Sequence, residues 1–323
     1  MAGCRFNSGS IRLSRWLSCS SLNWRGLIEL TTMKLLVPQK VLCAVITFGL
    51  VTFCVFAAEP NANELLAKAQ AAFDRGNRDE AFALADKAVQ ADPKHSRALF
   101  LRGQLYGLVR EHEKAIADFD RVIELDPRTA SAYQARGSER FKLGRIEASI
   151  SDFDKFLEFV PSRESHHWQR GISYYYAGRF ADGQRQFELH QTVNPNDVEN
   201  AVWHYLCLAR AVGVEKARSS LLDIKHDRRV PMMEIYALFR GTGTVEAVLN
   251  AVHAGDPPPD ELRQRFFYAH LYLGLYYEAN GQPKPAREHI TKAAEQYRVE
   301  HYMGDVARVH LQLLRQAEKK TTP

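Results

Sequence analysis

The stretch HHWQRGISYYYAGRF at positions 166–180 holds the side chains best suited to binding another molecule. Trp168, Ile172 and Tyr175 follow one another at intervals of four and three residues, which places them on one stripe of a helix. Aromatic rings bury a large apolar area, and those of Trp and Tyr also carry a hydrogen-bond donor. We therefore expect this stripe either to anchor side chains of a partner or to pack against the next segment of the chain.

Motifs of well-known catalytic chemistry are missing from the sequence. HExxH, GxSxG, CxxC and a glycine-rich phosphate loop do not occur. The segment DFD at 118–120 and again at 152–154 pairs two carboxylates, but residues two apart diverge on a helix, so we predict a solvated role for them. These features predict a protein that is not an enzyme and that needs no cofactor.

Histidines gather in the same region, at His166, His167, His190 and His204. Imidazoles on neighbouring helices are common zinc ligands, but a site needs three or four that converge. No pair in this group has the four-residue spacing that places two ligands on one helical face. An envelope enzyme or metal-binding protein that uses the His/Trp cluster around 166–204 is the alternative to a binding surface.

A period of 34 residues organises the chain around these side chains, because prolines stand at 93, 127, 161 and 195. Small residues precede the prolines by 24 positions, at Ala69, Gly103, Gly137 and Gly171. Seventeen positions before the prolines stand Gly76, Arg110, Gly144 and Gly178. Eight positions before the prolines stand Ala85, Phe119, Phe153 and Phe187. A helical hairpin explains each of these recurring positions. The two helices approach closely at the small residue, and an aromatic ring fills the seam, which is the interface between them. The first helix ends at a glycine with positive φ, and proline ends the second helix.

This pattern resembles the tetratricopeptide repeat (TPR), with four units in phase over about 62–195. The second unit is closest to the family pattern, with Leu99, Gly103, Tyr106, Ala115, Phe119 and Pro127. The resemblance implies an all-α fold, a superhelix of helical hairpins, which we expect a C-terminal capping helix at about 302–318 to close.

The first helix of each hairpin should line the inner, concave side of such a superhelix. The inward-facing positions predicted to form a protein-binding groove are Phe100, Gln104, Gln134, Ser138, Phe141, Trp168, Ile172 and Tyr175. A groove of this kind would take a peptide or a helix from a partner protein, with Trp and Tyr as anchors. The alternative is that the same side chains pack against the next repeat.

The rest of the chain departs from the strict period. We divide the sequence into a leader at 1–58, four repeat units at 59–197, a degenerate helical pair at 198–223, an insert with short helices at about 231–239 and 243–253 within 224–262, and a last repeat-like unit with the capping helix at 263–323. Cys207 is the only cysteine after the leader, so the body can form no internal disulfide.

Three segments of this later region are similar to NlpI-type bacterial periplasmic proteins. They read WHYLCLA at 203–209, RVPMMEIY at 229–236 and FYAHLYLGLYYEANG at 267–281. The resemblance covers about 62–318 and implies an adaptor that binds other envelope proteins, usually lipidated and dimeric. Phe53 stands before Cys54 where a lipidation signal has a small residue, and a homodimer is left open.

The leader predicts export. Residues 41–58, VLCAVITFGLVTFCVFAA, follow Lys34 and Lys40, in the order of a secretory signal. Met33 is the alternative start of the protein, and the apolar stretch is either a cleaved signal or an uncleaved membrane tether. Both readings place the repeats outside the cytoplasm, in a periplasmic or membrane-associated protein.

The charge distribution argues against a nucleic-acid partner. The net charge of the 323-residue chain is +5, but residues 1–57 hold six Lys or Arg and one Glu, which leaves 37 charges of each sign in the body. A neutral body offers no electrostatic attraction to phosphates. The expected partner is a protein or a peptide.

Overall fold

The computed structural model describes residues 61–321. Every feature below belongs to one compact unit of the chain, Ala58–Pro323. The predicted signal or tether at 41–58 and the alternative start at Met33 lie outside the described residues. Within residues 61–321, no helix combines the length and the hydropathy needed to cross a membrane.

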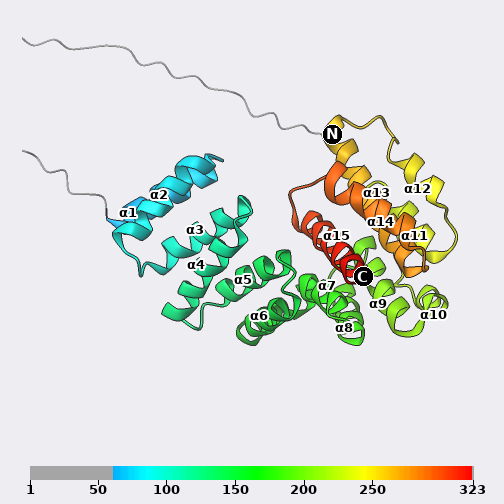
Figure 1. Ribbon diagram of the computed structural model, residues 1–323, viewed down its shortest axis with the longest axis horizontal. Helices are drawn as coiled ribbons and strands as arrows, with labels where there is room; N and C mark the ends of the chain where they lie inside the picture. The colour runs from blue at the N-terminus through cyan, green and yellow to red at the C-terminus, as the bar shows by residue number, and fades with distance from the viewer. Residues whose placement is uncertain (1–60, 322–323) are drawn as a thin grey trace, which may run out of the picture. The chain divides into compact units, whose positions relative to one another are not determined.

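Helices follow one another in pairs through the first half of this unit (Figure 1). In the first three pairs, each helix packs more extensively on its partner than on any other helix. The pairs are α1 (Ala62–Asp74) with α2 (Arg78–Ala91), α3 (Ser96–Leu108) with α4 (His112–Leu125), α5 (Ala130–Lys142) with α6 (Ile146–Phe159), and α7 (Trp168–Tyr176) with α8 (Phe180–Gln191). A 3₁₀ segment, Pro161–His166, connects α6 to α7.

The seams within the hairpins confirm the predicted columns of small and aromatic residues. A Cβ added to Gly103 would lie 2.8 Å from the Phe119 ring, and one added to Gly171 would lie 2.7 Å from the Phe187 ring. Real Cβ contacts are longer than this, so only glycine lets the two helices approach closely enough for the ring to fill the seam. Phe119 and Phe187 are each 1% exposed.

Arginines spaced by 34 residues connect neighbouring hairpins. Arg136 on α5 donates from Nε and Nη2 to Asp152 on α6, at 3.0 and 2.6 Å, and from Nη1 to Asp120 on α4, at 2.5 Å. Arg102 contacts Asp118 and Asp86 in the same manner. The prediction of a solvated role is therefore wrong for the first aspartate of each DFD segment, because Asp118 and Asp152 are buried beneath these guanidinium groups.

The second half of this unit continues with further helices. The helices are α9 (Val198–Val212), α10 (Val214–Ser219), α11 (Met232–Arg240), α12 (Val245–Ala251), α13 (Pro259–Ala279) and α14 (Pro283–Thr291), followed by a π-helical segment, Lys292–Gln296, and α15 (Tyr302–Thr321). Every regular element in the described residues is helical. The largest core cluster lies here and includes fully buried Trp203, Tyr205, Phe239, Phe267 and Tyr272.

The C-terminal helix does more than close the end of the stack. It packs on α14 and the π-helical segment, and it also contacts α5 of the third hairpin. The ring of Tyr302 stacks on Phe141 with centroids 5.3 Å apart, and the Tyr176 hydroxyl lies 3.0 Å from His310 Nδ1. The predicted capping helix thus also covers side chains of the third and fourth hairpins.

Candidate functional site

A pocket of about 330 Å³ lies among α7, α8, α9, α13 and the start of α15. Helix α7 contributes Trp168 and Ile172, and the later elements contribute Trp203, Tyr268 and Tyr302. Its volume falls within the range of small-molecule and side-chain binding sites. The pocket therefore contains two of the predicted groove residues, Trp168 and Ile172, and four aromatic residues that the groove prediction did not include, Phe187, Trp203, Tyr268 and Tyr302.

Ring contacts hold the aromatic walls in place. Trp168 meets the edge of Tyr302 at 5.2 Å between centroids, with the planes at 87°. Trp203 lies against Tyr175 at 5.3 Å and against Tyr176 at 6.1 Å. Such ring pairs stabilise one orientation of each ring beyond the area they bury.

Two acidic residues, Asp197 and Glu199, contribute to the polar part of the wall. Asp197 caps the N-terminus of α9 by accepting from the Glu199 backbone N–H at 3.1 Å. Arg229 donates to Asp197 at 2.6 Å, to Asp227 at 2.6 Å, and to Glu199. Tyr272 also donates its hydroxyl to Glu199, at 2.6 Å. Burial raises the pKa of Glu199 to about 7, against the opposing charge of Arg229, so this carboxyl is poised to gain or lose a proton near neutrality.

Four buried polar atoms on the wall have no hydrogen-bond partner among the described residues. They are the Oδ1 of Asn200, the indole Nε1 of Trp203, the Nε2 of His301 and the hydroxyl of Tyr302. As residues, Asn200 and Trp203 are only 3% and 2% exposed. The amide nitrogen of Asn200 donates to the Phe187 carbonyl and to Gln191, both at 3.0 Å, which leaves its oxygen as the free acceptor. Buried polar groups are rarely left unpaired without a functional or solvent partner.

The eight predicted groove residues do not form one surface. Phe141, Ile172 and Tyr175 are 0%, 1% and 5% exposed, so the structure places them in the core instead of on an open face. Tyr302 covers Phe141, and Trp203 covers Tyr175. Trp168 is half-buried and reaches the pocket.

The other four predicted residues lie away from the pocket. Phe100 is half-buried against Phe119, and Gln104 is exposed on α3. Gln134 and Ser138 are joined through Gln169, which accepts from Gln134 at 2.7 Å and donates to Ser138 at 3.3 Å. Partner binding by these four stays a prediction.

The residues missed by the prediction are those on α9, α13 and α15. Trp203 and Tyr268 stand in two of the segments similar to NlpI-type proteins, WHYLCLA and FYAHLYLGLYYEANG, which was a usable signal. The stacked pair of Tyr268 and Tyr272, four residues apart, was another. No local pattern indicated that Tyr302 would reach the same place.

The histidines of the 166–204 region do not converge. His167 bonds to Gln134 at 2.6 Å, His190 to the Ser165 carbonyl at 2.9 Å, and His204 to Glu188 at 3.3 Å. Across the part of the chain that the structure describes, no group of three His, Cys, Asp or Glu is placed to hold a metal ion. Each of these imidazoles has a structural partner of its own.

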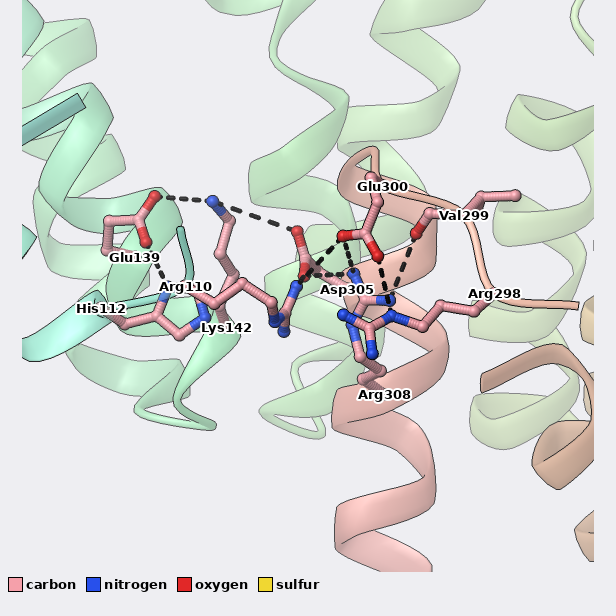
Figure 2. Close-up of polar contacts among 9 residues, drawn as sticks. All are labelled: Arg110, His112, Glu139, Lys142, Arg298, Val299, Glu300, Asp305 and Arg308. Carbon is pink, nitrogen blue, oxygen red and sulfur yellow. Dashed lines mark hydrogen bonds and ion pairs between the residues drawn. The ribbon is translucent and has the colours of Figure 1, made fainter. Parts of the chain in front are cut away.

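Charged contacts fix the start of α15, and with it one wall of the pocket (Figure 2). Asp305 accepts from Arg110 and from Arg308, each at 2.7 Å, and Lys142 lies 4.0 Å away. Lys142 also donates to Glu139, which bonds to His112. Burial alone would raise the pKa of Asp305, but hydrogen bonds from Arg308 and Arg110 and the charge of Lys142 hold it below its usual value.

Comparison with known proteins identifies the repeats. The tetratricopeptide repeat family matches residues 66–128. No curated protein sequence matches the chain. A tetratricopeptide repeat protein from Parabacteroides merdae ATCC 43184 has a TM-score of 0.52 at 15% identity, and the match covers 79% of this chain and 98% of that one. Residues 66–128 therefore carry tetratricopeptide repeats, and the chain has the all-α fold of stacked helical hairpins.

Two further structures are similar over shorter stretches. YrrB, described as a TPR protein with an unusual peptide-binding site, gives a TM-score of 0.48 at 16% identity, covering 59% of this chain and 91% of its own. The first TPR of Spaghetti (RPAP3), bound to an HSP90 peptide, gives 0.31 at 29% identity, covering 31% and 80%. The narrower resemblance to NlpI-type proteins stays a prediction.

Proposed function

We propose that this chain is a non-catalytic scaffold that binds a partner protein, with the pocket between α7 and α15 as its anchor site. The observation that supports it is the pocket itself, with aromatic walls held by ring contacts and buried polar atoms that lack partners. A few aromatic anchors in a pocket of this kind supply most of the affinity of a protein interface.

The rim of the pocket favours a partner larger than a free small molecule. Asn194 is exposed at the edge of the pocket, next to Val193, an apolar side chain that is 41% exposed. A partner segment that inserts one side chain into the pocket could cover this apolar edge with its neighbouring residues. Stacked hairpins present extended surfaces that suit such a segment.

We also propose that the protein is exported through the leader at 1–58 and acts in the periplasm or at the membrane, as an adaptor. The support is the apolar stretch 41–58 behind Lys34 and Lys40. N-terminal sequencing of the native protein tests this: a start at or near residue 58 or 59 indicates a cleaved signal. Light scattering tests for a homodimer.

Site-specific photo-crosslinking in the native host tests the scaffold. A photoreactive amino acid at Asn194 places the probe on the exposed rim, and the same probe at Glu124 on the exposed face of α4 is the control. We expect a discrete protein adduct from position 194 and none from 124. Adducts that form equally at both positions, or at neither, contradict the proposal.

Truncation of the anchor gives a second test. Trp168→Ala should weaken capture of the crosslinked partner by about tenfold, as for a central aromatic anchor, while the far-UV helical signal stays normal. Phe82→Ala removes another half-buried ring, one that packs on Tyr106 in the first hairpins, and should leave capture unchanged. Equal losses from both variants would indicate a general loss of structure.

A further inference from the structure

The charges around the pocket do not balance. Asp197, Glu199 and Asp227 share a single guanidinium, that of Arg229. Within the described residues, no second Lys or Arg forms an ion pair with any of the three. The side chain of Arg229 is 42% exposed, whereas the three carboxylates are 19%, 14% and 5% exposed, so the acidic groups lie deeper than their counter-ion. Even with Glu199 partly protonated near neutrality, the carboxylates of Asp197 and Asp227 outnumber this one guanidinium, so the site has capacity for a second positive charge.

The pocket wall also presents carboxylates without a cationic side chain of its own. Lys and Arg are missing from its lining, while Asp197, Glu199 and the free Oδ1 of Asn200 all present oxygen. An apolar side chain placed here would leave the Oδ1 of Asn200 without a donor. An anionic group would meet two carboxylates. A ligand group that carries several N–H donors and a positive charge satisfies both conditions.

The aromatic walls favour the same class of ligand. The rings of Trp168, Trp203 and Tyr268 line the pocket beside the carboxylates. A cation over the face of a Trp or Tyr ring is attracted by the ring quadrupole, and a planar guanidinium can also stack on it. The buried indole N–H of Trp203 needs an acceptor, which a peptide carbonyl next to a basic side chain would supply.

We propose that the pocket binds a basic side chain, preferentially arginine, in a segment of the partner protein. This inference rests on the scaffold function proposed above, because it names the chemistry that the same site recognises. The guanidinium enters between the Trp and Tyr rings and donates to Asp197 and Asn200, while the neighbouring residues of the segment cover the rim near Asn194.

Short peptides of defined charge test this with the full chain. The probes are acetyl-Ala-Ala-Arg-Ala-Ala-amide and the matching peptides with citrulline, lysine, leucine or glutamate at the centre. Citrulline has nearly the shape of arginine without its charge. The readout is the pair of indole N–H signals of Trp168 and Trp203, which both line the pocket and are assigned with Trp168→Phe and Trp203→Phe. The arginine peptide should bind about tenfold tighter than the citrulline peptide.

Asp197→Asn removes one charge and keeps a residue that can cap α9. It should weaken binding of the arginine peptide about fivefold or more and leave the citrulline peptide unchanged. Asp182→Asn is the control, because Asp182 pairs with Arg179 and Arg185 and does not line the pocket. Citrulline, leucine or glutamate peptides that bind as tightly as the arginine peptide would overturn the inference. So would the lack of any indole shift at about 5 mM peptide, a weak limit for a single anchored side chain.

The two proposals fail in different ways. If position 194 crosslinks a partner but arginine has no advantage over citrulline, the scaffold stands and the basic ligand is wrong. If arginine is preferred while no partner crosslinks at position 194, the pocket recognises cations but the scaffold function is wrong.

Discussion

The guanidinium of Arg110 lies 2.7 Å from the carboxylate of Asp305, which is 195 residues further along the chain. Arg110 occupies the turn between α3 and α4 with φ +64°, where the equivalent turns use Gly76, Gly144 and Gly178 with φ between +73° and +78°. A left-handed conformation costs a non-glycine residue about 1–2 kcal/mol. The contact with α15 offsets that cost, and it places Tyr302 against the pocket.

This relationship predicts different stabilities for two substitutions at one position. Arg110→Ala loses the ion pair and keeps the strained backbone, whereas Arg110→Gly loses the ion pair and relaxes the backbone. We expect Arg110→Ala to be about 1 kcal/mol less stable than Arg110→Gly, and both to be less stable than the parent chain. Urea unfolding measures the difference, and equal stability of the two variants would contradict the strain argument.

The arginines that connect neighbouring hairpins predict a large loss of stability when Arg136 is replaced. Arg136→Leu leaves Asp152, which is 2% exposed, with Arg140 as its remaining cation at 2.9 Å. Removing one partner of a buried ion pair is strongly destabilising, so we expect a loss of about 3 kcal/mol in the free energy of unfolding. Arg121→Leu breaks the exposed pair with Glu124 and should cost less than about 1 kcal/mol. Similar losses for both would show that burial of Asp152 is unimportant.

Gly183 occupies the position that Ala115 holds two repeat periods earlier, and its surroundings predict that alanine is not tolerated there. A Cβ on Gly183 would lie 2.7 Å from the sulfur of Cys207 on α9, so Gly183→Ala should destabilise the chain by about 1–3 kcal/mol. Cys207→Ala vacates that space, and the double variant should recover part of the loss. Thermal unfolding of the four proteins forms the cycle. Losses that simply add would rule out the contact.

The stability of the fold should decrease in acid because of His167. Burial lowers the pKa of His167 to about 4, and the charge of Arg170 lowers it further in the same direction. The unfolded chain, in which histidine titrates near 6.5, therefore binds more protons between pH 6.5 and 4, and the stability contributed by this group is lost as the pH falls through that window. The loss reaches about 3 kcal/mol below pH 4.

A substitution isolates this contribution. His167 caps α7 by accepting from the Arg170 backbone N–H, and Asn can provide the same cap without a titrating group. His167→Asn should reduce the slope of unfolding free energy against pH between 6.5 and 4. His270, whose pKa burial and the neighbouring His289 also lower to about 4, keeps its share of the slope in that variant. An unchanged slope would assign the acid sensitivity elsewhere.

The predictions that were confirmed depended on residues that lie close to one another in the sequence. The seam between Gly103 and Phe119 was visible because one hairpin brings together positions 16 residues apart, and the same spacing recurs at Gly171 and Phe187. The insert helices α11 and α12 were predicted at nearly their observed bounds for a similar reason, since glycine and proline delimit them locally. The wrong prediction for Asp118 and Asp152 came from considering one helix alone, without the arginine of the helix packed on it.

The amino-acid sequence by itself determined the helical hairpins, their 34-residue period and the repeat class, because helix length, turn geometry and seam packing all depend on residues within one unit. Only the tertiary structure decided where α15 lies, which of the predicted groove residues are covered, and that Trp168, Trp203 and Glu199 share one pocket with Tyr302. The physical reason is that the packing between neighbouring helices repeats along the chain and can be predicted from one unit. Contacts such as that of Arg110 with Asp305 instead depend on how many hairpins lie between the third helix and the C-terminal helix that packs back on the earlier hairpins.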